Sequence, residues 1–157
     1  QIVFPLLKGI LNLNFLEIIS EPGWGVKKFM SKDIPQNLPS ADICIVALGG
    51  NNFDMSSNSY MNTVTEFLDV LKPKFKRIVW IGPYFATRED VDRRHAITNL
   101  FLKLHLPISV GYIETYKLGR EIPHYDGVHY KRDGYQQLVE LFITKLKSLM
   151  LLLVVLL

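Results

Sequence analysis

The sequence predicts an α/β protein in which a parallel sheet lies between two layers of helices. Two apolar runs, Asp42–Leu48 and Arg77–Ile81, lack the polar alternation of a strand with one face in solvent. Such runs are typical of strands that helices cover on both faces, as in parallel sheets. Segments with helical spacing separate the runs, which favours parallel pairing through right-handed crossovers. The predicted fold is therefore a three-layer α/β/α sandwich.

The chain before the first apolar run predicts four short elements. They are a helix over Pro5–Leu13, a strand over Phe15–Ser20, a turn rich in backbone breakers at 21–25, and a short helix over Val26–Met30. Pro35 and Pro39 then predict a loop.

The rest of the chain alternates helices and strands. The first helix has a buried face of Val64, Phe67, Leu68 and Leu71. After the strand Arg77–Ile81, a second helix has a predicted buried face of Ile97, Leu100, Phe101 and Leu104. A strand over Ile108–Ile113 and a last helix follow, and the predicted apolar face of that helix is Leu138, Leu141, Phe142 and Leu149.

Composition argues against several classes of function. The net charge is only +3 and the basic residues form no long run, so we expect no nucleic-acid partner. The single cysteine, Cys44, predicts a buried thiol and excludes an intrachain disulfide. The histidines have no zinc-like spacing, so no metal is expected, and His95 and His105 are predicted to be solvated on a helix surface.

The 157 residues suit one domain, which we assign to residues 1–149, followed by an apolar tail over 150–157. The tail is too short to span a bilayer alone. The start has no initiator Met and no basic segment of a signal peptide, so we expect both ends to be cut. Compartment and oligomeric state are not predicted.

A short segment near the C-terminus carries the chemistry. In Asp126-Gly127-Val128-His129 a carboxylate precedes an imidazole by three residues. The carboxylate can orient the ring and stabilise its protonated form, which is what a general base acting on a hydroxyl requires. The alternative for this spacing is a turn before a helix.

Three separated blocks together resemble the SGNH, or GDSL-type, serine hydrolases. They are Pro22-Gly23-Trp24-Gly25, Gly49-Gly50-Asn51-Asn52 and Asp126-Gly127-Val128-His129, with Gly134-Tyr135 beyond them. The resemblance implies hydrolysis of a small acyl ester without a metal or organic cofactor. It implies His129 as the general base and Asp126 as its partner. It also implies the Asn51 amide and the Gly23 backbone N–H as donors to the oxyanion, the negative oxygen of the tetrahedral intermediate.

The chain departs from the family in two ways. Asn52 stands where the family has Asp, and no Gly-Asp-Ser block with its nucleophilic serine occurs. The family's first strand, which lies mid-sheet, is also absent. We therefore expect the chain to begin just after the missing serine and to be inactive as given. We expect the apolar tail to extend the last helix or to begin a segment that is also cut off, rather than to fill the vacant strand position.

Two other classes of protein are alternatives to an esterase. The missing serine allows a catalytically inactive binding module that keeps the SGNH fold. An unrelated flavodoxin-like or nucleotide-binding domain is disfavoured, because the chain has neither a G-x-G-x-x-G fingerprint nor a P-loop.

Overall fold

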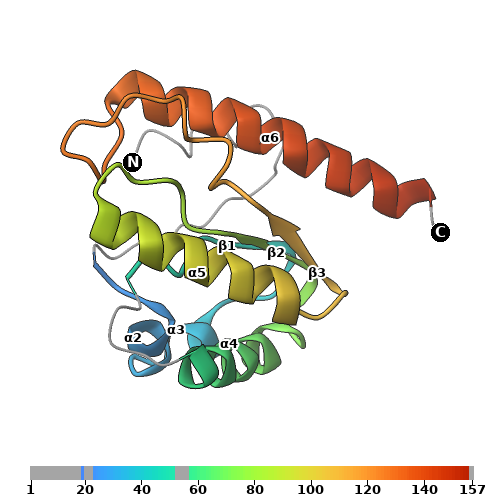
Figure 1. The fold of residues 1–157 in the computed structure, drawn as a ribbon. Coiled ribbons are helices and arrows are strands. Elements are labelled where there is room, and N and C mark those ends of the chain that lie inside the picture. The colour runs from blue at the N-terminus through green and yellow to red at the C-terminus, as the bar shows by residue number, and fades with distance from the viewer. Residues whose placement is uncertain (1–18, 20–22, 52–56, 156–157) are drawn as a thin grey trace.

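The computed structural model describes residue 19 and residues 23–51 and 57–155. The predicted helix over 5–13 and strand over 15–20 lie outside these residues, residue 19 excepted. The elements, labelled as in Figure 1, are α2 (Val26–Met30), α3 (Ile34–Asn37), β1 (Ala41–Val46), α4 (Ser57–Leu71), β2 (Phe75–Ile81), α5 (Glu89–His105), β3 (Val110–Ile113) and α6 (Arg132–Val155).

The described strands form one parallel sheet in the order β1-β2-β3. Cys44 pairs with Ile78, and Trp80 pairs with Tyr112. Within the described residues no strand pairs with the outer edge of β1. Parallel pairing places the carboxyl ends of all three strands at one edge of the sheet, where sites of open α/β sheets form.

Successive residues of β2 supply the two hydrophobic layers. Ile78 and Trp80 pack with residues of α2 and α4, and Val79 packs with the buried residues of α6. Figure 1 shows α6 along one face of the sheet and α2 to α4 on the other. Trp80 is fully buried, and its Nε1 donates to the Leu48 carbonyl at 2.9 Å. This bond joins the core to the loop after β1.

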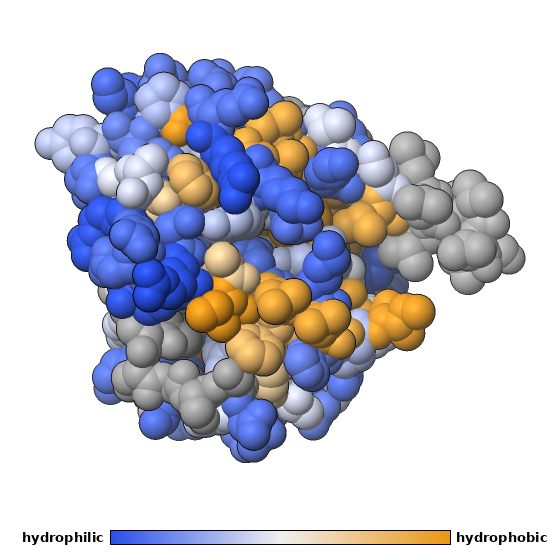
Figure 2. All heavy atoms as spheres, in the orientation of Figure 1, coloured by the Kyte–Doolittle hydropathy of each residue, from blue (hydrophilic) through white to orange (hydrophobic). Residues whose placement is uncertain are grey.

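The predicted buried face of α5 is wrong. Leu100 and Leu104 are 55% and 66% exposed, and Ile97 is exposed as well. The buried residues of this helix are instead Val91, His95, Asn99 and Leu102. His95 and Asn99 can be buried because their polar atoms bond to loop carbonyls. Figure 2 shows the resulting band of apolar side chains over α5.

Four further sequence predictions need correction or completion. Pro35 lies within the short helix α3 rather than in a loop, because proline is tolerated in a first helical turn. Ile108 is fully exposed and precedes β3. Leu141 of α6 is also exposed, while Ile143 and Leu146 are buried. Residues 150–155 continue α6, which corresponds to the helix-extension alternative for the tail.

Candidate active site

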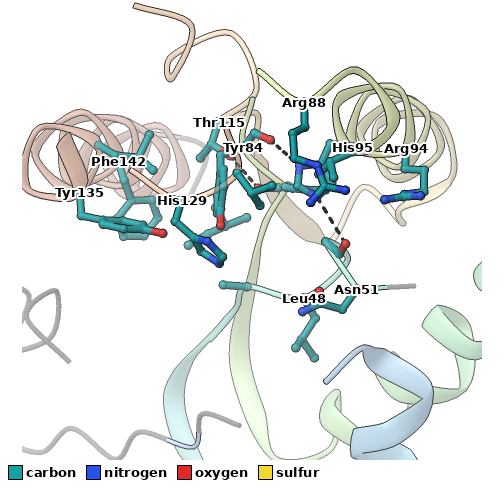
Figure 3. A pocket seen from close by; sticks show the side chains of 18 of the residues that line it. Leu48, Asn51, Tyr84, Arg88, Arg94, His95, Thr115, His129, Tyr135 and Phe142 are labelled. Carbon is teal, nitrogen blue, oxygen red and sulfur yellow. Dashed lines mark hydrogen bonds between the residues drawn. The ribbon is translucent and has the colours of Figure 1, made fainter. Parts of the chain in front are cut away.

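A cavity of about 580 Å³ opens at the carboxyl ends of the strands, and all four predicted site residues line it. Gly23 precedes α2 and Asn51 lies in the loop after β1, whereas Asp126 and His129 precede α6. Figure 3 shows the His129 ring and the Asn51 side chain directed into the cavity. The structure thus brings together three blocks that are far apart in the sequence.

The Asp126 carboxylate makes three short contacts within its own loop. One oxygen, Oδ1, accepts the backbone N–H groups of Val128 at 2.9 Å and His129 at 2.7 Å. The other, Oδ2, lies 2.8 Å from His129 Nδ1. With a proton on Nδ1 bonded to the carboxylate, the neutral ring has its lone pair on Nε2, which is the arrangement of a general base.

These contacts also set the charge state of Asp126. The backbone N–H of His129 is the largest cause that holds its pKa well below the ordinary 3.8, and the His129 side chain adds to it. The carboxylate is therefore ionised at neutral pH. Both side chains are substantially exposed, His129 by 60%, so water can reach the pair from one side.

The loop that carries this pair is anchored to the start of α5. The backbone N–H groups of Thr87 and Arg88 both donate to the Gly127 carbonyl, at 2.8 and 3.0 Å. Gly127 has a φ of +83°, and an added Cβ would lie 3.0 Å from Arg88 Cγ. Glycine adopts this left-handed conformation without strain, and a larger residue would press on the Arg88 side chain.

The two predicted oxyanion donors lie in turns at the cavity. Gly23 has a φ of +76°, which glycine adopts without strain, and it is exposed. Asn51 is exposed and follows Gly49, whose φ is +138°. An added Cβ on Gly49 would meet Tyr60 Oη at 3.0 Å, so this turn also excludes larger residues.

The β2 loop, residues 82–87, forms another wall and is held by side chains. Its carbonyls at 82 to 85 each face a polar side chain from a later part of the chain. The partners are Thr115 for Gly82 at 2.6 Å, Asn99 for Pro83 at 2.6 Å, His95 for Tyr84 at 2.7 Å, and His124 and Tyr130 for Phe85 at 2.9 and 3.1 Å. This loop is accordingly a fixed part of the cavity.

The remaining walls are mainly apolar and aromatic. Tyr84 and Tyr135 have ring centroids 6.4 Å apart in an edge-to-face arrangement, and both line the cavity. Burial raises the pKa of Tyr84, so its hydroxyl stays protonated at neutral pH. The face of α6 adds Leu138, Val139 and Phe142. Such walls suit a small uncharged group better than a charged one.

A neighbouring cavity of about 550 Å³ shares several lining residues with the first. Gly23, Asn51 and His129 border both cavities, and Trp24 and Phe67 line only the second. Space is thus open on two sides of Gly23, Asn51 and His129.

Two arginines complete the rim of the main cavity. Arg88 and Arg94 line it, and each donates to Asp90 Oδ2, at 3.0 and 3.2 Å. Arg93 instead pairs with Glu89 away from the cavity. Because a carboxylate accompanies the guanidinium groups, the rim is polar rather than strongly cationic.

His95 is the residue of this region that sequence reasoning placed wrongly. It is 3% exposed, it lines the cavity, and its ring lies between two loop carbonyls. Helical spacing placed it opposite the apolar residues of α5, where solvent is the usual expectation. Only the position of those carbonyls reveals that this face is the buried one. His105 is exposed, as predicted.

No serine or cysteine occurs among the described residues that line the cavity. Within the described ranges there is also no cluster of three or more His, Cys, Asp or Glu side chains that could hold a metal ion. Nor is any helix in this part of the chain long and apolar enough to cross a bilayer.

No protein-family model matches the sequence, and no curated protein matches it. Several solved structures do. A catalytic mutant of an acetylxylan esterase from Geobacillus stearothermophilus matches with a TM-score of 0.69 at 16% identity, over 91% of this chain and 78% of that one. A carbohydrate esterase of family 3 from Talaromyces cellulolyticus matches with a TM-score of 0.66 at 14% identity, over 94% of this chain and 88% of that one.

A third structure belongs to the lipolytic G-D-S-L family and comes from Veillonella parvula. It has a TM-score of 0.66 at 13% identity, over 88% of this chain and 83% of that one. At such identities the likeness is one of fold. The chain has the α/β fold of the SGNH hydrolases, as its three sequence blocks predicted.

Proposed function

We propose that this chain carries the greater part of an SGNH-type ester hydrolase. The observation that supports this most is the shared cavity, in which an Asp–His pair and an asparagine in a glycine-rich turn occur together. A binding module has no need for that combination. The solved structures of similar fold include esterases, which agrees with the proposal.

In the proposed mechanism a serine hydroxyl attacks the ester carbonyl, and His129 Nε2 accepts the hydroxyl proton. Asp126 keeps Nδ1 protonated and stabilises the imidazolium that forms. The tetrahedral intermediate collapses to an acyl-enzyme, and the imidazolium gives its proton to the leaving alcohol. Water then attacks the acyl-enzyme with His129 again as the base, which releases the acid and regenerates the serine.

Asn51 and the Gly23 backbone N–H are the proposed donors to the oxyanion. Both are uncharged, so they stabilise the developing negative charge without holding the neutral substrate strongly. Both residues are exposed and line the cavity, which supports this role.

The proposed substrate is an uncharged ester with a small acyl group. The apolar walls from α6 and the aromatic rings of Tyr84 and Tyr135 support this class. Acetyl esters are the first to test, since the similar structures include an acetylxylan esterase.

The nucleophile is proposed to be a serine in a Gly-Asp-Ser block that precedes this sequence. The test is to extend the chain before Gln1 by a strand ending in Gly-Asp-Ser and the start of a helix. The extended protein should hydrolyse p-nitrophenyl acetate, and replacing the new serine by alanine should abolish this. A folded extended protein that binds acetyl esters but never cleaves them would instead indicate a binding module.

A further inference from the structure

Two tyrosines at the cavity have hydroxyl groups that the proposed mechanism does not use. Tyr84 comes from the β2 loop and Tyr135 from the first turn of α6. Both border the two cavities, together with Gly23, Asn51 and His129. Figure 3 shows both rings directed toward the part of the cavity that holds the His129 ring. The two hydroxyls therefore lie beside the place where the proposed ester bond would be cleaved.

Aromatic neighbours hold both rings in place. The Tyr84 ring packs against Tyr130 and His95, with centroids 5.1 and 5.7 Å away, and the contact with His95 is edge to face. The Tyr135 ring packs edge to face against Tyr130 at 5.5 Å. Such contacts have preferred geometries and restrict the rings that make them. The hydroxyls are thus presented to the cavity from a fixed framework.

These two hydroxyls differ from that of Tyr130. Tyr130 donates to the carbonyls of Phe85 and Gly119, at 3.1 and 3.3 Å. Within the described residues no carbonyl or carboxylate accepts the hydroxyl of Tyr84 or Tyr135. Burial is the main cause that raises the pKa of Tyr84, and the neighbouring Tyr135 hydroxyl adds to it through its charge and a hydrogen bond. Two phenols carry two protons and a bond between them uses one, so one proton is left for a group in the cavity.

The surroundings of His129 indicate which part of an ester these hydroxyls would meet. The charge of Asp126 also raises the pKa of Tyr84, and Asp126 Oδ2 lies 2.8 Å from His129 Nδ1. In the proposed mechanism His129 gives a proton to the leaving alcohol, so the leaving oxygen must come within hydrogen-bonding distance of that ring. Groups beside His129 therefore face the alcohol part of the ester.

We propose that the hydroxyls of Tyr84 and Tyr135 determine specificity by hydrogen-bonding a second hydroxyl of the alcohol, close to its ester oxygen. The preferred substrates are then acetyl esters of polyols rather than of simple alkanols. This inference rests on the proposed function for the place of the leaving oxygen. In the free protein water can take the same bond, and an alkanol displaces that water without replacing the bond, whereas a polyol replaces it.

Binding can be measured without hydrolysis, because the 157-residue chain has no Gly-Asp-Ser block and is expected not to cleave esters. The ligands are glyceryl monoacetate and n-propyl acetate, which share one carbon skeleton, and the Gly23 and Asn51 signals in a ¹H–¹⁵N NMR spectrum report binding. The double variant Tyr84→Phe/Tyr135→Phe keeps both rings and loses both hydroxyls. Its Kd for glyceryl monoacetate should rise by about 2- to 10-fold, as for one uncharged hydrogen bond, and its Kd for propyl acetate should not rise.

Tyr125→Phe is the matched control, since Tyr125 is exposed, precedes Asp126 and lines neither cavity. It should leave both Kd values unchanged. The proposal is overturned if the double variant binds glyceryl monoacetate as tightly as wild type. It is also overturned if affinity for both esters falls equally, because the tyrosines would then shape the cavity without recognising a hydroxyl. Either result would leave the proposed hydrolysis standing.

The extended protein gives a second readout. The ratio of kcat/KM for glyceryl monoacetate to that for propyl acetate should fall by about the same factor in the double variant. An equal loss of kcat on both esters would assign the tyrosines to the oxyanion, and a lower Tm with an unchanged ratio would make them structural; both results contradict the proposal. If the extended protein cleaved neither ester but the binding preference were found, the proposed function would fail and the polyol site would stand.

Discussion

Two histidines of this site are held in opposite ways. His129 is exposed, and its partner Asp126 lies three residues away in the same loop. His95 is buried, and its partners lie 11 and 45 residues away, in two different loops. The first can exchange protons with a substrate and with water. The second is almost wholly buried, and both of its ring nitrogens face backbone carbonyl oxygens.

The two histidines belong to two different parts of the cavity wall. The proposed chemistry belongs to a short loop that folds on itself, where Asp126 accepts two backbone N–H groups and faces the His129 ring. Buried polar side chains of α5 instead lie against carbonyls of the loops after β1 and β2. Substitutions in the two regions should accordingly affect different quantities.

The largest effect is expected for His129→Ala in the extended protein. Loss of a general base typically costs 10²–10⁴-fold in rate, so kcat for p-nitrophenyl acetate should fall by about that factor. The side chain is exposed, and the free energy of unfolding should change by no more than about 0.5 kcal/mol. His105→Ala serves as the control with unchanged kcat. If His129→Ala were as active as wild type, the proposed base would be wrong.

Asn51→Ala should have the next largest effect. Removing one oxyanion donor lowers kcat by about 10²–10³-fold, with a smaller change in KM. Steady-state kinetics on acetyl esters would measure the two separately. A variant that raised KM and kept kcat would show instead that Asn51 binds the substrate in its ground state.

Asn99→Ala tests how much the buried polar side chains of α5 contribute to stability. Its Nδ2 donates to the carbonyls of Pro83 and His95, and its Oδ1 accepts the Tyr112 hydroxyl. Leaving such buried groups unpaired costs about 1–3 kcal/mol, measurable by urea denaturation. Leu100→Ala, one residue along the helix but exposed, should change stability by less than about 0.5 kcal/mol. Equal effects would mean that Asn99 contributes little.

The smallest expected effect is on the pH dependence of the free energy of unfolding. The pKa of His95 is lowered from its ordinary 6.5, mainly by burial and to a smaller extent by the charge of Arg94. The contacts with the Tyr84 and Gly50 carbonyls and the charge of Asp92 act in the opposite direction and raise it. Below pH 6.5 the unfolded chain therefore binds a proton that the folded chain does not. The contribution of His95 to the free energy of unfolding is therefore complete above pH 6.5. It decreases as the pH falls below 6.5, by at most about 1.4 kcal/mol per pH unit.

His95→Gln removes this titration. Urea denaturation of wild type and variant between pH 5 and 8 should show the stability difference shrinking, or reversing in favour of the variant, as the pH falls. Parallel curves for the two proteins would show that His95 binds its proton equally well in the folded and unfolded chain.

The sequence indicated the parts of the site that are local. Asp126 and His129 are three residues apart, so their contact needs only one turn, and Gly127 supplies the left-handed conformation for it. The alternation of apolar runs and helical segments also indicated the parallel sheet, because burial of strands on both faces is visible in composition. The resemblance of the three sequence blocks also predicted the fold that the similar solved structures have.

The misplaced face of α5 shows where sequence reasoning fails. Hydrophobic spacing selected Ile97, Leu100 and Leu104 as buried, whereas His95 and Asn99 occupy the interior. Those two polar residues are buried because loop carbonyls come within hydrogen-bonding distance of them. No spacing rule contains that information, since the carbonyls belong to residues far away along the chain.

The sequence by itself thus determined the fold class and the Asp126–His129 pair, because both depend on periodicity or on neighbours in the chain. Tertiary structure alone decided that Gly23, Asn51 and His129 line one cavity, and which face of α5 supports it. The physical reason is that a buried polar group is stable only beside its partners, and those partners come together only when the whole sheet has formed.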